Sequence, residues 1–259
     1  MKIGLVADIH GNYHALAAVL AALARQQVDI VLCAGDLVCY GAQPLEVIDT
    51  LRGAMIPAVA GNYDEAAGWN LPKAARKPSS PANEVLKQAA LEWTKDQLDA
   101  TARAYLRSLP RSAYFVLDTV RVALVHGGLD YTDEWITPDE PHALSRLAAR
   151  LDADVVVLGH THQAFVVETQ GRDGAPVLAV NPGAVGRALD GDVRAAYAIL
   201  DSSTHRVDLH RLEYDLAGAV EAIAQSTMPP GIADLVRHGL RRIEQLPQHG
   251  GGQLKGVAT

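Results

Sequence analysis

The sequence predicts an α/β protein, on the evidence of two patterns in its 259 residues. Short apolar runs alternate with amphipathic stretches over roughly the first 60 residues, which is typical of βαβ units in a parallel sheet. Beyond about residue 110, apolar runs follow one another closely, which predicts a second, largely antiparallel sheet. A hydrophobic content of 49% is enough for one sizeable core.

The N-terminal elements follow from the spacing of apolar residues. Leu16, Val19, Leu20 and Leu23 recur at the i, i+3, i+4, i+7 spacing that places side chains on one face of a helix. We expect strands at 2–7, 29–34 and 56–60, and helices at 13–26 and 44–51.

Residues 65–110 differ from their surroundings and predict a small helical cap inserted over one edge of the core. A polar connector with two prolines, residues 73–81, precedes two helical stretches. These stretches are expected at about 83–93 and 96–109, and Pro110 ends the second because proline cannot continue a helix.

The remaining elements are strands and a helical tail. Strands are expected as the pairs 113–117 with 120–125 and 155–158 with 164–168, and then at 177–180, 195–200 and 207–212. The glycines at 171 and 174 indicate a hairpin turn. A helical tail is predicted from about 216 to 246, before a glycine run at 250–252 that is typical of a frayed terminus.

Charge, cysteine content and hydropathy exclude several classes of protein. A net charge of −7 argues against binding to a nucleic-acid duplex, which calls for a basic surface. Cys33 and Cys39 form neither a CxxC motif nor a disulfide framework, so a reducing cytoplasmic setting is expected. No apolar segment is long enough for a signal peptide or a membrane helix, so we expect no membrane association.

Metal-binding residue types follow five of the predicted strands. In chain order these are Asp8 and His10, Asp36 after Gly35, Asn62 and Asp64 after Gly61, His126, and His160 with His162. In open α/β sheets, ligand sites form outside the carboxyl ends of the strands. The sequence therefore predicts that these side chains gather at one site.

Imidazole and carboxylate ligands together suit Zn, Fe or Mn ions, whereas Mg or Ca prefers oxygen ligands alone. The set is too large for a single catalytic ion that must keep positions free for water and substrate, but it divides evenly over two ions if one carboxylate bridges. Taken singly, each motif is also compatible with a helix cap, a turn or a surface histidine. The joint pattern favours a metal centre.

These motifs, in this order, resemble those of the calcineurin-like metallophosphoesterase superfamily. The short chain is most similar to the compact bacterial and archaeal phosphodiesterase branch, and the loop 181–186 (Asn-Pro-Gly-Ala-Val-Gly) also resembles that branch. The motifs cover roughly residues 1–200, while the helical tail matches none of them.

The resemblance implies a fold of two packed mixed β-sheets flanked by helices, in four layers. It also implies the metal ligands. Asp8, His10 and His162 would bind one divalent transition-metal ion, Asn62, His126 and His160 a second, and Asp36 would bridge them. The ions would be Mn, Fe or Zn, with Mn favoured, and would activate a bridging hydroxide to attack a phosphate ester.

One residue departs from the family pattern. Much of the superfamily has a histidine after the motif asparagine, which can protonate the leaving oxygen, and here this residue is Tyr63. A phenol with a pKa near 10 is a poor proton donor at neutral pH, so its catalytic role is open. Asp64 remains to orient a neighbour, Asn62 is also a candidate substrate contact, and Arg187 could hold a phosphate oxygen.

The hypothesis is therefore a dinuclear metal-dependent phosphohydrolase, with a phosphodiesterase favoured. Residues 1–214 would form the catalytic domain, including the cap at 65–110, and residues 215–259 a C-terminal helical appendage. The alternatives are a phosphomonoesterase, acting on proteins or nucleotides at the same site, and an interaction scaffold with little activity. The expected partner is a small phosphate ester, and self-association is left open.

Overall fold

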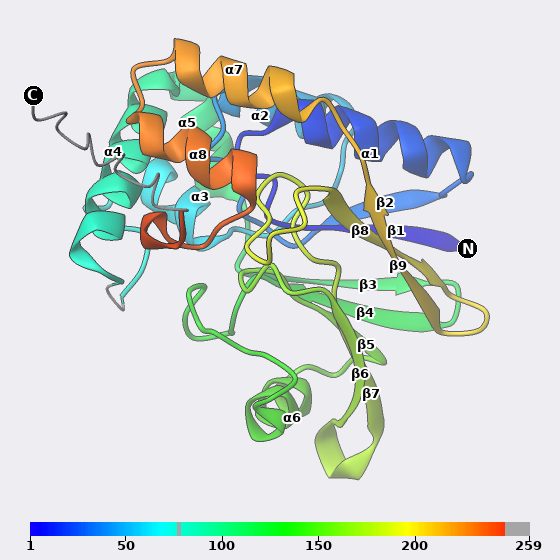
Figure 1. Cartoon of the computed structure of the whole chain (residues 1–259). Coiled ribbons are helices and arrows are strands. Elements are labelled where there is room, and N and C mark those ends of the chain that lie inside the picture. The colour runs from blue at the N-terminus through cyan, green and yellow to red at the C-terminus, as the bar shows by residue number, and fades with distance from the viewer. Residues whose placement is uncertain (77–78, 247–259) are drawn as a thin grey trace, which may run out of the picture.

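Two β-sheets form the centre of the computed structural model, which describes residues 1–76 and 79–246 (Figure 1). The four-stranded sheet has the order β2-β1-β8-β9 and the five-stranded sheet the order β3-β4-β5-β7-β6. The first comprises β1 (Lys2–Val6), β2 (Ile30–Cys33), β8 (Ala195–Asp201) and β9 (Arg206–Leu212). The second comprises β3 (Ser112–Leu117), β4 (Val120–Val125), β5 (Val155–Val157), β6 (Phe165–Gln170) and β7 (Pro176–Asn181).

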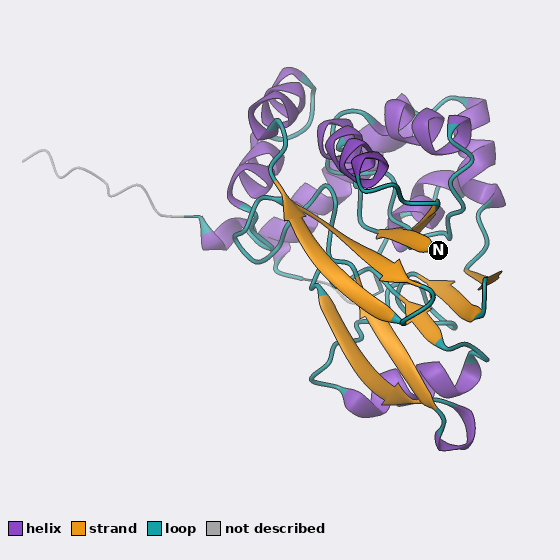
Figure 2. Ribbon diagram, turned by 90° about the vertical axis from the view of Figure 1, so that its right-hand side faces the viewer, coloured by secondary structure: helices purple, strands orange, loops and turns teal. Residues whose placement is uncertain are grey.

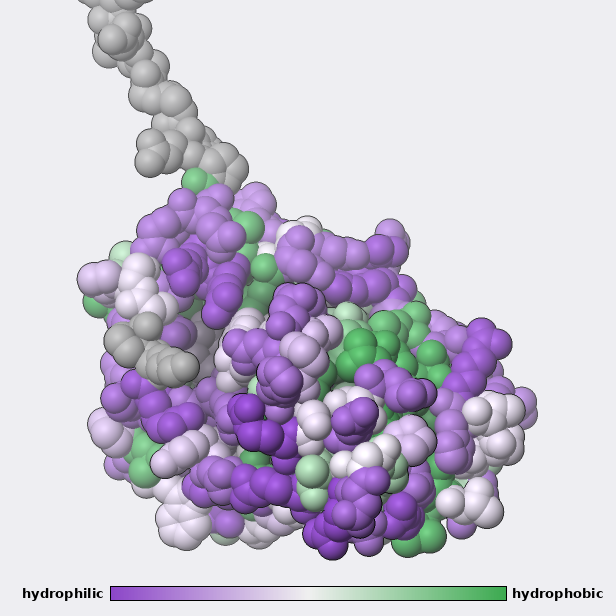
Figure 3. Space-filling view, turned by 90° about the horizontal axis from the view of Figure 1, so that it is seen from below, coloured by the Kyte–Doolittle hydropathy of each residue, from purple (hydrophilic) through white to green (hydrophobic). Residues whose placement is uncertain are grey.

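Helices cover the outer faces of both sheets, which gives the four layers that we expected (Figures 1 and 2). The helices on the side of the four-stranded sheet are α1 (Tyr13–Arg25), α2 (Pro44–Gly53), α7 (Leu216–Gln225) and α8 (Pro230–His238). On the far side, α6 (Pro141–Arg150) packs against β6 and β7. The face seen from below is mainly hydrophilic around one hydrophobic patch (Figure 3), as expected where a helix turns its apolar residues inward.

Three buried clusters fill the spaces between these layers. The first joins the helices to the four-stranded sheet and includes Leu16, Val19 and Val220. The second lies between the two sheets and is built of β-branched and leucine side chains such as Leu5 and Val122. A third packs α6 onto the five-stranded sheet. Burial of these apolar side chains fixes the two sheets face to face, and so fixes the relative position of their strand ends.

Local sequence explains where the helices begin. The Asn12 side chain accepts a hydrogen bond from the Ala15 amide at 3.0 Å, and so caps α1. Proline occupies the first turn of α2, α6 and α8, where its missing N–H costs nothing. The predicted turn at Gly171 and Gly174 is confirmed, because it joins β6 to β7.

The predicted strand directions are wrong in part. In the four-stranded sheet only β1 and β2 are parallel, while β8 pairs antiparallel with both β1 and β9. The five-stranded sheet contains two parallel pairs, β4–β5 and β5–β7, so it is mixed. The predicted pairing of 155–158 with 164–168 is also wrong, because β7 lies between β5 and β6. The parallel pairing of β4 with β5 follows from α6, which carries the chain from the end of β4 back to the start of β5.

Three local predictions need correction. Residues 56–60 form no strand, only an isolated bridge between Ala58 and Cys33. Pro57 has no N–H to donate to a ladder, although its carbonyl accepts from the Cys33 amide at 2.9 Å. Two helices were not expected: α3 (Asn62–Gly68) and α6.

Helices α4 (Pro81–Gln97) and α5 (Ala100–Ser108) pack against α3, and the interpretation of residues 65–110 as a cap stays a prediction. The helical tail packs into the body of the protein, because α7 contacts α1 and α8 contacts α4. Val220, Ile223 and Ile232 belong to the same buried cluster as α1. The boundary after residue 214 stays a prediction, and the glycines at 250–252 lie outside the described residues. Nowhere in 1–76 or 79–246 is a helix long and apolar enough to cross a membrane.

Candidate metal centre

Four strands, two from each sheet, end at one edge of the sandwich and deliver the predicted ligands to a common point. Asp8 and His10 follow β1, Asp36 follows β2, His126 follows β4, and His160 and His162 follow β5, while Asn62 begins α3. Apart from the half-buried His160, the side chains are almost inaccessible to solvent, with exposed fractions of 0% for Asp8 and His126 and 1% for His10 and Asp36. Burial of so many ionisable groups is costly unless they bind a common partner.

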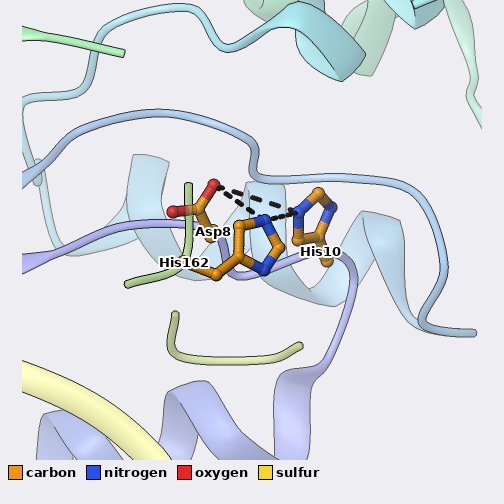
Figure 4. A group of neighbouring side chains, drawn as sticks. All are labelled: Asp8, His10 and His162. Atoms are coloured by element: carbon orange, nitrogen blue, oxygen red, sulfur yellow. Dashed lines mark hydrogen bonds and ion pairs between the residues drawn. The ribbon is translucent and has the colours of Figure 1, made fainter. Parts of the chain in front are cut away.

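Asp8, His10 and His162 form the first group of candidate ligands (Figure 4). Their ligand atoms all lie within 4.8 Å of one another. The two imidazoles point their Nε2 atoms at each other across 3.2 Å, and the Asp8 Oδ1 atom lies 3.4 Å from the Nε2 of His162. The three side chains therefore converge on one point, as the ligands of a single ion do.

Hydrogen bonds on the other ring nitrogens decide the tautomers of these histidines. The Nδ1 of His10 lies 3.2 Å from the Val38 carbonyl oxygen, and the Nδ1 of His162 lies 2.5 Å from the Arg187 carbonyl oxygen. A carbonyl only accepts, so Nδ1 carries the proton in both rings and each Nε2 presents a lone pair. Two lone pairs at 3.2 Å repel, and a cation between them removes the conflict.

Asp36, His126 and His160 form the second group. The Nε2 of His126 lies 3.2 Å from Asp36 Oδ2 and 3.2 Å from Asn62 Oδ1. The Nδ1 of His126 donates to the Ala34 carbonyl at 2.7 Å, which again leaves Nε2 to face the site. The amide oxygen of Asn62 thus lies where a fourth ligand is needed.

The carboxylate of Asp36 lies between the two groups. Its Oδ2 atom is 3.2 Å from the Nε2 of His126 in the second group and 3.7 Å from the Nε2 of His10 in the first. Asp8 offers a further atom, because its Oδ2 is buried and has no hydrogen-bond partner among the described residues. An orphaned buried carboxylate oxygen fits a missing cation, so the residues present fit two metal ions.

The surroundings keep most of the histidines in the form that binds metal. Burial lowers the pKa of His10 to about 4 and that of His160 to about 3, and lowers the pKa of His162 well below its usual range. For His126 burial acts in the same direction but is outweighed by Asp36 and Asp8, which raise its pKa to about 10.

The two carboxylates move in opposite directions. Burial raises the pKa of Asp8 to about 8. Burial would raise the pKa of Asp36 too, but its contacts with His126 and the nearby His10 lower it instead.

The backbone at these ligands adopts a conformation that non-glycine residues rarely take. Positive φ angles occur at five of the candidate ligands: Asp8 (54°), His10 (49°), Asp36 (54°), His160 (66°) and His162 (57°). Such strain persists only where the surrounding structure imposes it, and it concentrates at functional sites. The left-handed turns redirect the chain as each strand ends, so that the side chains point into the site.

Asp64 supports the loops that carry the ligands and is not itself within either group. Its Oδ1 accepts hydrogen bonds from the Leu37 and Val38 amides at 2.8 and 3.3 Å, and its Oδ2 accepts one from the Gly61 amide at 2.9 Å. The carboxylate therefore ties the segment after Asp36 to the segment before Asn62.

A cavity of about 730 Å³ opens above the metal ligands. Tyr63 lines it, and its hydroxyl is hydrogen-bonded to that of Tyr40 at 2.6 Å. Burial raises the pKa of Tyr63 well above its usual value. Arg187 also lines the cavity and lies over the Tyr40 ring, with its guanidinium carbon 4.0 Å from the ring centroid.

Sequence reasoning missed some residues that support the site. Tyr40 was not predicted, although it touches both Tyr63 and the ring of His10. Asn181, noted only as part of a resembling loop, donates from Nδ2 to the Gly159 carbonyl at 2.8 Å and so supports the loop of His160 and His162. Tyr40 could not have been found from sequence, because an aromatic residue four positions after Asp36 matches no motif spacing.

Known proteins share this arrangement. The calcineurin-like phosphoesterase superfamily domain matches residues 1–205, which is most of the chain. The chain belongs to the calcineurin-like phosphoesterase superfamily. The two groups of His and Asp ligands are accordingly the candidate metal sites of a metal-dependent phosphoesterase.

Relatives extend the similarity beyond this domain. An uncharacterized protein of Methanocaldococcus jannaschii is 27% identical over 244 residues, covering 90% of this chain and 96% of the relative. The crystal structure of a metallophosphoesterase from Sphaerobacter thermophilus is 30% identical, with a TM-score of 0.73 over 93% of this chain and 99% of that one. A hypothetical protein from Pyrococcus horikoshii shares the fold, with 20% identity and a TM-score of 0.78 over 92% and 98% of the two chains.

Proposed function

We propose that this superfamily member is a dinuclear phosphodiesterase. The observation that carries the proposal is the position of Asp36, whose Oδ2 lies between a histidine of each ligand group, 3.7 Å from His10 Nε2 and 3.2 Å from His126 Nε2. Asp8, His10 and His162 would hold one ion and Asn62, His126 and His160 the other. Two such ions, with Mn favoured, would lower the pKa of a bound water and neutralise charge that develops on the phosphoryl group.

The residues of this chain would do the rest. Water would add to phosphorus, and the P–O bond to one ester group would break, giving a phosphomonoester and an alcohol. Arg187 would donate to a non-bridging phosphate oxygen from the cavity wall, where its charge is partly desolvated. Tyr63 would hold the substrate against the Tyr40 hydroxyl and would not act as an acid, because burial raises the pKa of its phenol further.

The shape of the cavity supports a diester over a monoester. A diester carries a group on each side of the phosphorus and needs open space on both sides of the metal ligands. The cavity provides that space, since its lining extends to Asn83 of α4 on one side and to Arg146 of α6 on the other. A site without a good internal acid should also favour diesters with good leaving groups.

The test combines metal stoichiometry with activity. The purified chain, reconstituted with Mn²⁺, should bind about two equivalents and hydrolyse bis-p-nitrophenyl phosphate. Asp36→Ala should lose at least one ion and nearly all activity, because the bridging carboxylate serves both ions. A matched control is Asp49→Ala, which removes an exposed carboxylate that pairs with Arg52 on the surface of α2. That variant should retain both ions and full activity.

Two results would overturn the proposal. A fully reconstituted protein that holds one ion or none would exclude the dinuclear centre. Two ions without turnover of any diester would exclude the phosphodiesterase, and a preference for monoesters under the same conditions would favour the phosphomonoesterase instead.

A further inference from the structure

Arg187 is a buried cation without a carboxylate partner. Its exposed fraction is 6%, and its Nε atom has no hydrogen-bond partner among the described residues. No ion pair to Arg187 occurs within 1–76 and 79–246, and its guanidinium instead lies on the ring of Tyr40. A buried guanidinium in this state is costly unless an anion reaches it.

Two further arginines, Arg241 and Arg242, line the same cavity from the segment that follows α8. That segment is fixed to the chain just after Arg187, because the Gly191 amide donates to the Gly239 carbonyl at 3.0 Å and Leu240 forms a bridge with Asp190. The arginines therefore reach the cavity from two connected segments, one of which lies beyond the residues 1–205 that match the family domain.

The geometry around Arg241 mirrors that around Arg187. The Arg241 guanidinium carbon lies 4.2 Å from the Trp135 ring centroid, and Trp135 contacts the ring of His160 at 5.5 Å. Arg187 lies over Tyr40, which contacts the ring of His10 at 5.3 Å. Each candidate metal group thus has one arginine held one aromatic ring away from it.

The two sides of the cavity differ in charge. Arg76 is neutralised by Asp133, whose carboxylate accepts from its Nε at 2.6 Å. Glu134 and Glu140 also line the cavity, so the loop before α6 is acidic. Within the part of the chain that the structure describes, neither Arg241 nor Arg242 forms an ion pair, although the charge of Arg242 helps to lower the pKa of Glu244. Burial lowers the pKa of Arg241, and the charges of Arg242 and Arg187 lower it further.

The net charge of the metal centre indicates which class of substrate these arginines would bind. Two divalent ions held by Asp8 and Asp36 with neutral histidines would leave two positive charges, which a bound hydroxide and a diester with one negative charge would balance. Arg187 would already contact that diester, so Arg241 and Arg242 are in excess for such a substrate. A further phosphate would satisfy them, and guanidinium groups suit phosphate because they donate in pairs.

We propose that Arg241 and Arg242, which line the cavity together with Arg187, form a subsite for a second phosphate group, so that the preferred substrate carries two or more phosphates, one of them at the metal centre. This inference rests on the proposed phosphodiesterase for the identity of the reaction. It concerns substrate class, and it assigns a binding role to the segment after α8.

The kinetic test compares two substrates with the same leaving group, the p-nitrophenyl esters of AMP and of ADP, on the Mn²⁺-loaded full chain with products separated by chromatography. The ratio of kcat/KM for the ADP ester to that for the AMP ester should exceed about ten, because charged hydrogen bonds are strong. It should fall at least about tenfold in the double variant Arg241→Gln, Arg242→Gln. The corresponding double lysine variant should keep most of the preference, since it keeps the charge.

Arg237→Gln is the matched control. It removes an arginine from the neighbouring α8, where its guanidinium pairs with Asp234 at 2.6 Å and does not line the cavity. The ratio should stay within about twofold of the wild-type value, as for most exposed pairs. An equal loss on both esters in the double glutamine variant would overturn the subsite, because general electrostatic attraction or misfolding would explain it.

A binding measurement separates the subsite from the proposed reaction. Tripolyphosphate should bind the metal-free chain at about 150 mM salt in calorimetry, where surface attraction is screened. The double glutamine variant should bind it at least about tenfold more weakly, and Arg237→Gln should not. If this difference is found but no ester is hydrolysed, the subsite stands and the phosphodiesterase fails. If diesters are hydrolysed but neither the ratio nor tripolyphosphate binding depends on Arg241 and Arg242, the subsite fails alone.

Discussion

The floor and the wall of the cavity are built in different ways. The floor consists of side chains at the ends of sheet strands, such as Asp8 and His126, which are fully buried and hydrogen-bonded to neighbouring loops. The wall consists of charged side chains on helices and connecting segments, such as Lys87, Arg146 and Arg241, which are partly or fully exposed. Many contacts fix the side chains of the floor, whereas few contacts fix those of the wall.

This difference indicates a division of labour. Two packed sheets and the loops at their strand ends fix the metal ligands, so chemistry on the floor should tolerate almost no change. Helices and segments outside the sheets can vary without disturbing that geometry. Substrate choice should therefore depend on the wall, as the proposed phosphate subsite does.

The largest effect on the floor is expected from a substitution that introduces a steric clash there. A Cβ atom at Gly61 would lie 2.1 Å from Asp36 Oδ1, so alanine there must displace the proposed bridging carboxylate. Gly61→Ala should lose metal and reduce kcat/KM by at least about a hundredfold. Stoichiometry by metal analysis and turnover of bis-p-nitrophenyl phosphate would measure both effects.

Gly53→Ala supplies the control, because nothing lies within 4 Å of a Cβ at that position in α2. It should leave metal content and activity unchanged and should not lower stability, since alanine is the better helix former. Full metal content in Gly61→Ala would contradict the rigidity that we assign to the floor.

The floor was also the part that sequence predicted well. Asp8, His10, Asp36, His126 and His160 each follow a short apolar run, and strand ends at one sheet edge bring such residues together wherever the strands lie in the order. The resemblance then supplied the two-sheet fold. Sequence alone divided the sheets wrongly into parallel and antiparallel, because β7 and β8 pair with strands distant in the chain.

Apart from Arg187, which sequence analysis named as a candidate, wall residues such as Arg241 and Trp135 were not predicted, for physical reasons. Arg241 and Trp135 come from segments more than a hundred residues apart and meet only through tertiary packing. Their residue types are common on surfaces, so no spacing marks them. The helix α6 could have been found, since Leu144, Leu147 and Ala148 share one face behind a proline in the first turn.

Asp64 tests whether support of the floor matters as much as ligation. Asp64→Asn puts an amide NH₂ where a carboxylate oxygen accepts backbone N–H groups, so one of the bonds to Leu37 or Gly61 must break. Metal affinity should fall about 10- to 100-fold, as for other residues that orient ligands, with the stoichiometry at saturation unchanged. Competition with a chelator would measure it, with exposed Asp96→Asn as the control. An unchanged affinity would make Asp64 dispensable.

As the pH is lowered, the floor should lose its metal ions before the protein unfolds. Without metal, Asp8 with a pKa of about 8 and His126 with a pKa of about 10 are both protonated at pH 7, and both must lose the proton to bind an ion. Metal binding should therefore release protons, and affinity should rise with pH by about tenfold per pH unit for each proton displaced, most steeply below about pH 8, where both groups are protonated. Calorimetry in buffers of different ionisation enthalpy would count the protons. An affinity that is constant between about pH 6 and 8 would contradict these protonation states.

Tyr63 lies where floor and wall meet, and its removal should have a modest effect. Tyr63→Phe deletes the hydroxyl bonded to Tyr40 but keeps the ring against His10 and the backbone bond from the Tyr63 amide to Asp36 Oδ1 at 2.9 Å. Turnover of an activated diester should fall by less than about tenfold, because general acid catalysis typically contributes 10²–10⁴. A loss of about a hundredfold that steepens with the pKa of the leaving group would show that the phenol donates the proton.

The smallest effect is expected at the part of the wall that α4 contributes. Lys87 lines the cavity from α4 but pairs with Glu84 at 3.1 Å, and about a quarter of its side chain is exposed, so its attraction for an anionic substrate is largely offset. Lys87→Gln should raise KM about two- to fivefold at low salt, leave kcat and metal content unchanged, and have no effect near 1 M salt, where charges are screened beyond about 3 Å. Arg25→Gln removes an equal charge from the exposed end of α1, outside the cavity lining, and should change nothing. A lower kcat or a lost ion in Lys87→Gln would show that α4 acts on the floor, and the separation between metal chemistry and substrate choice would then fail.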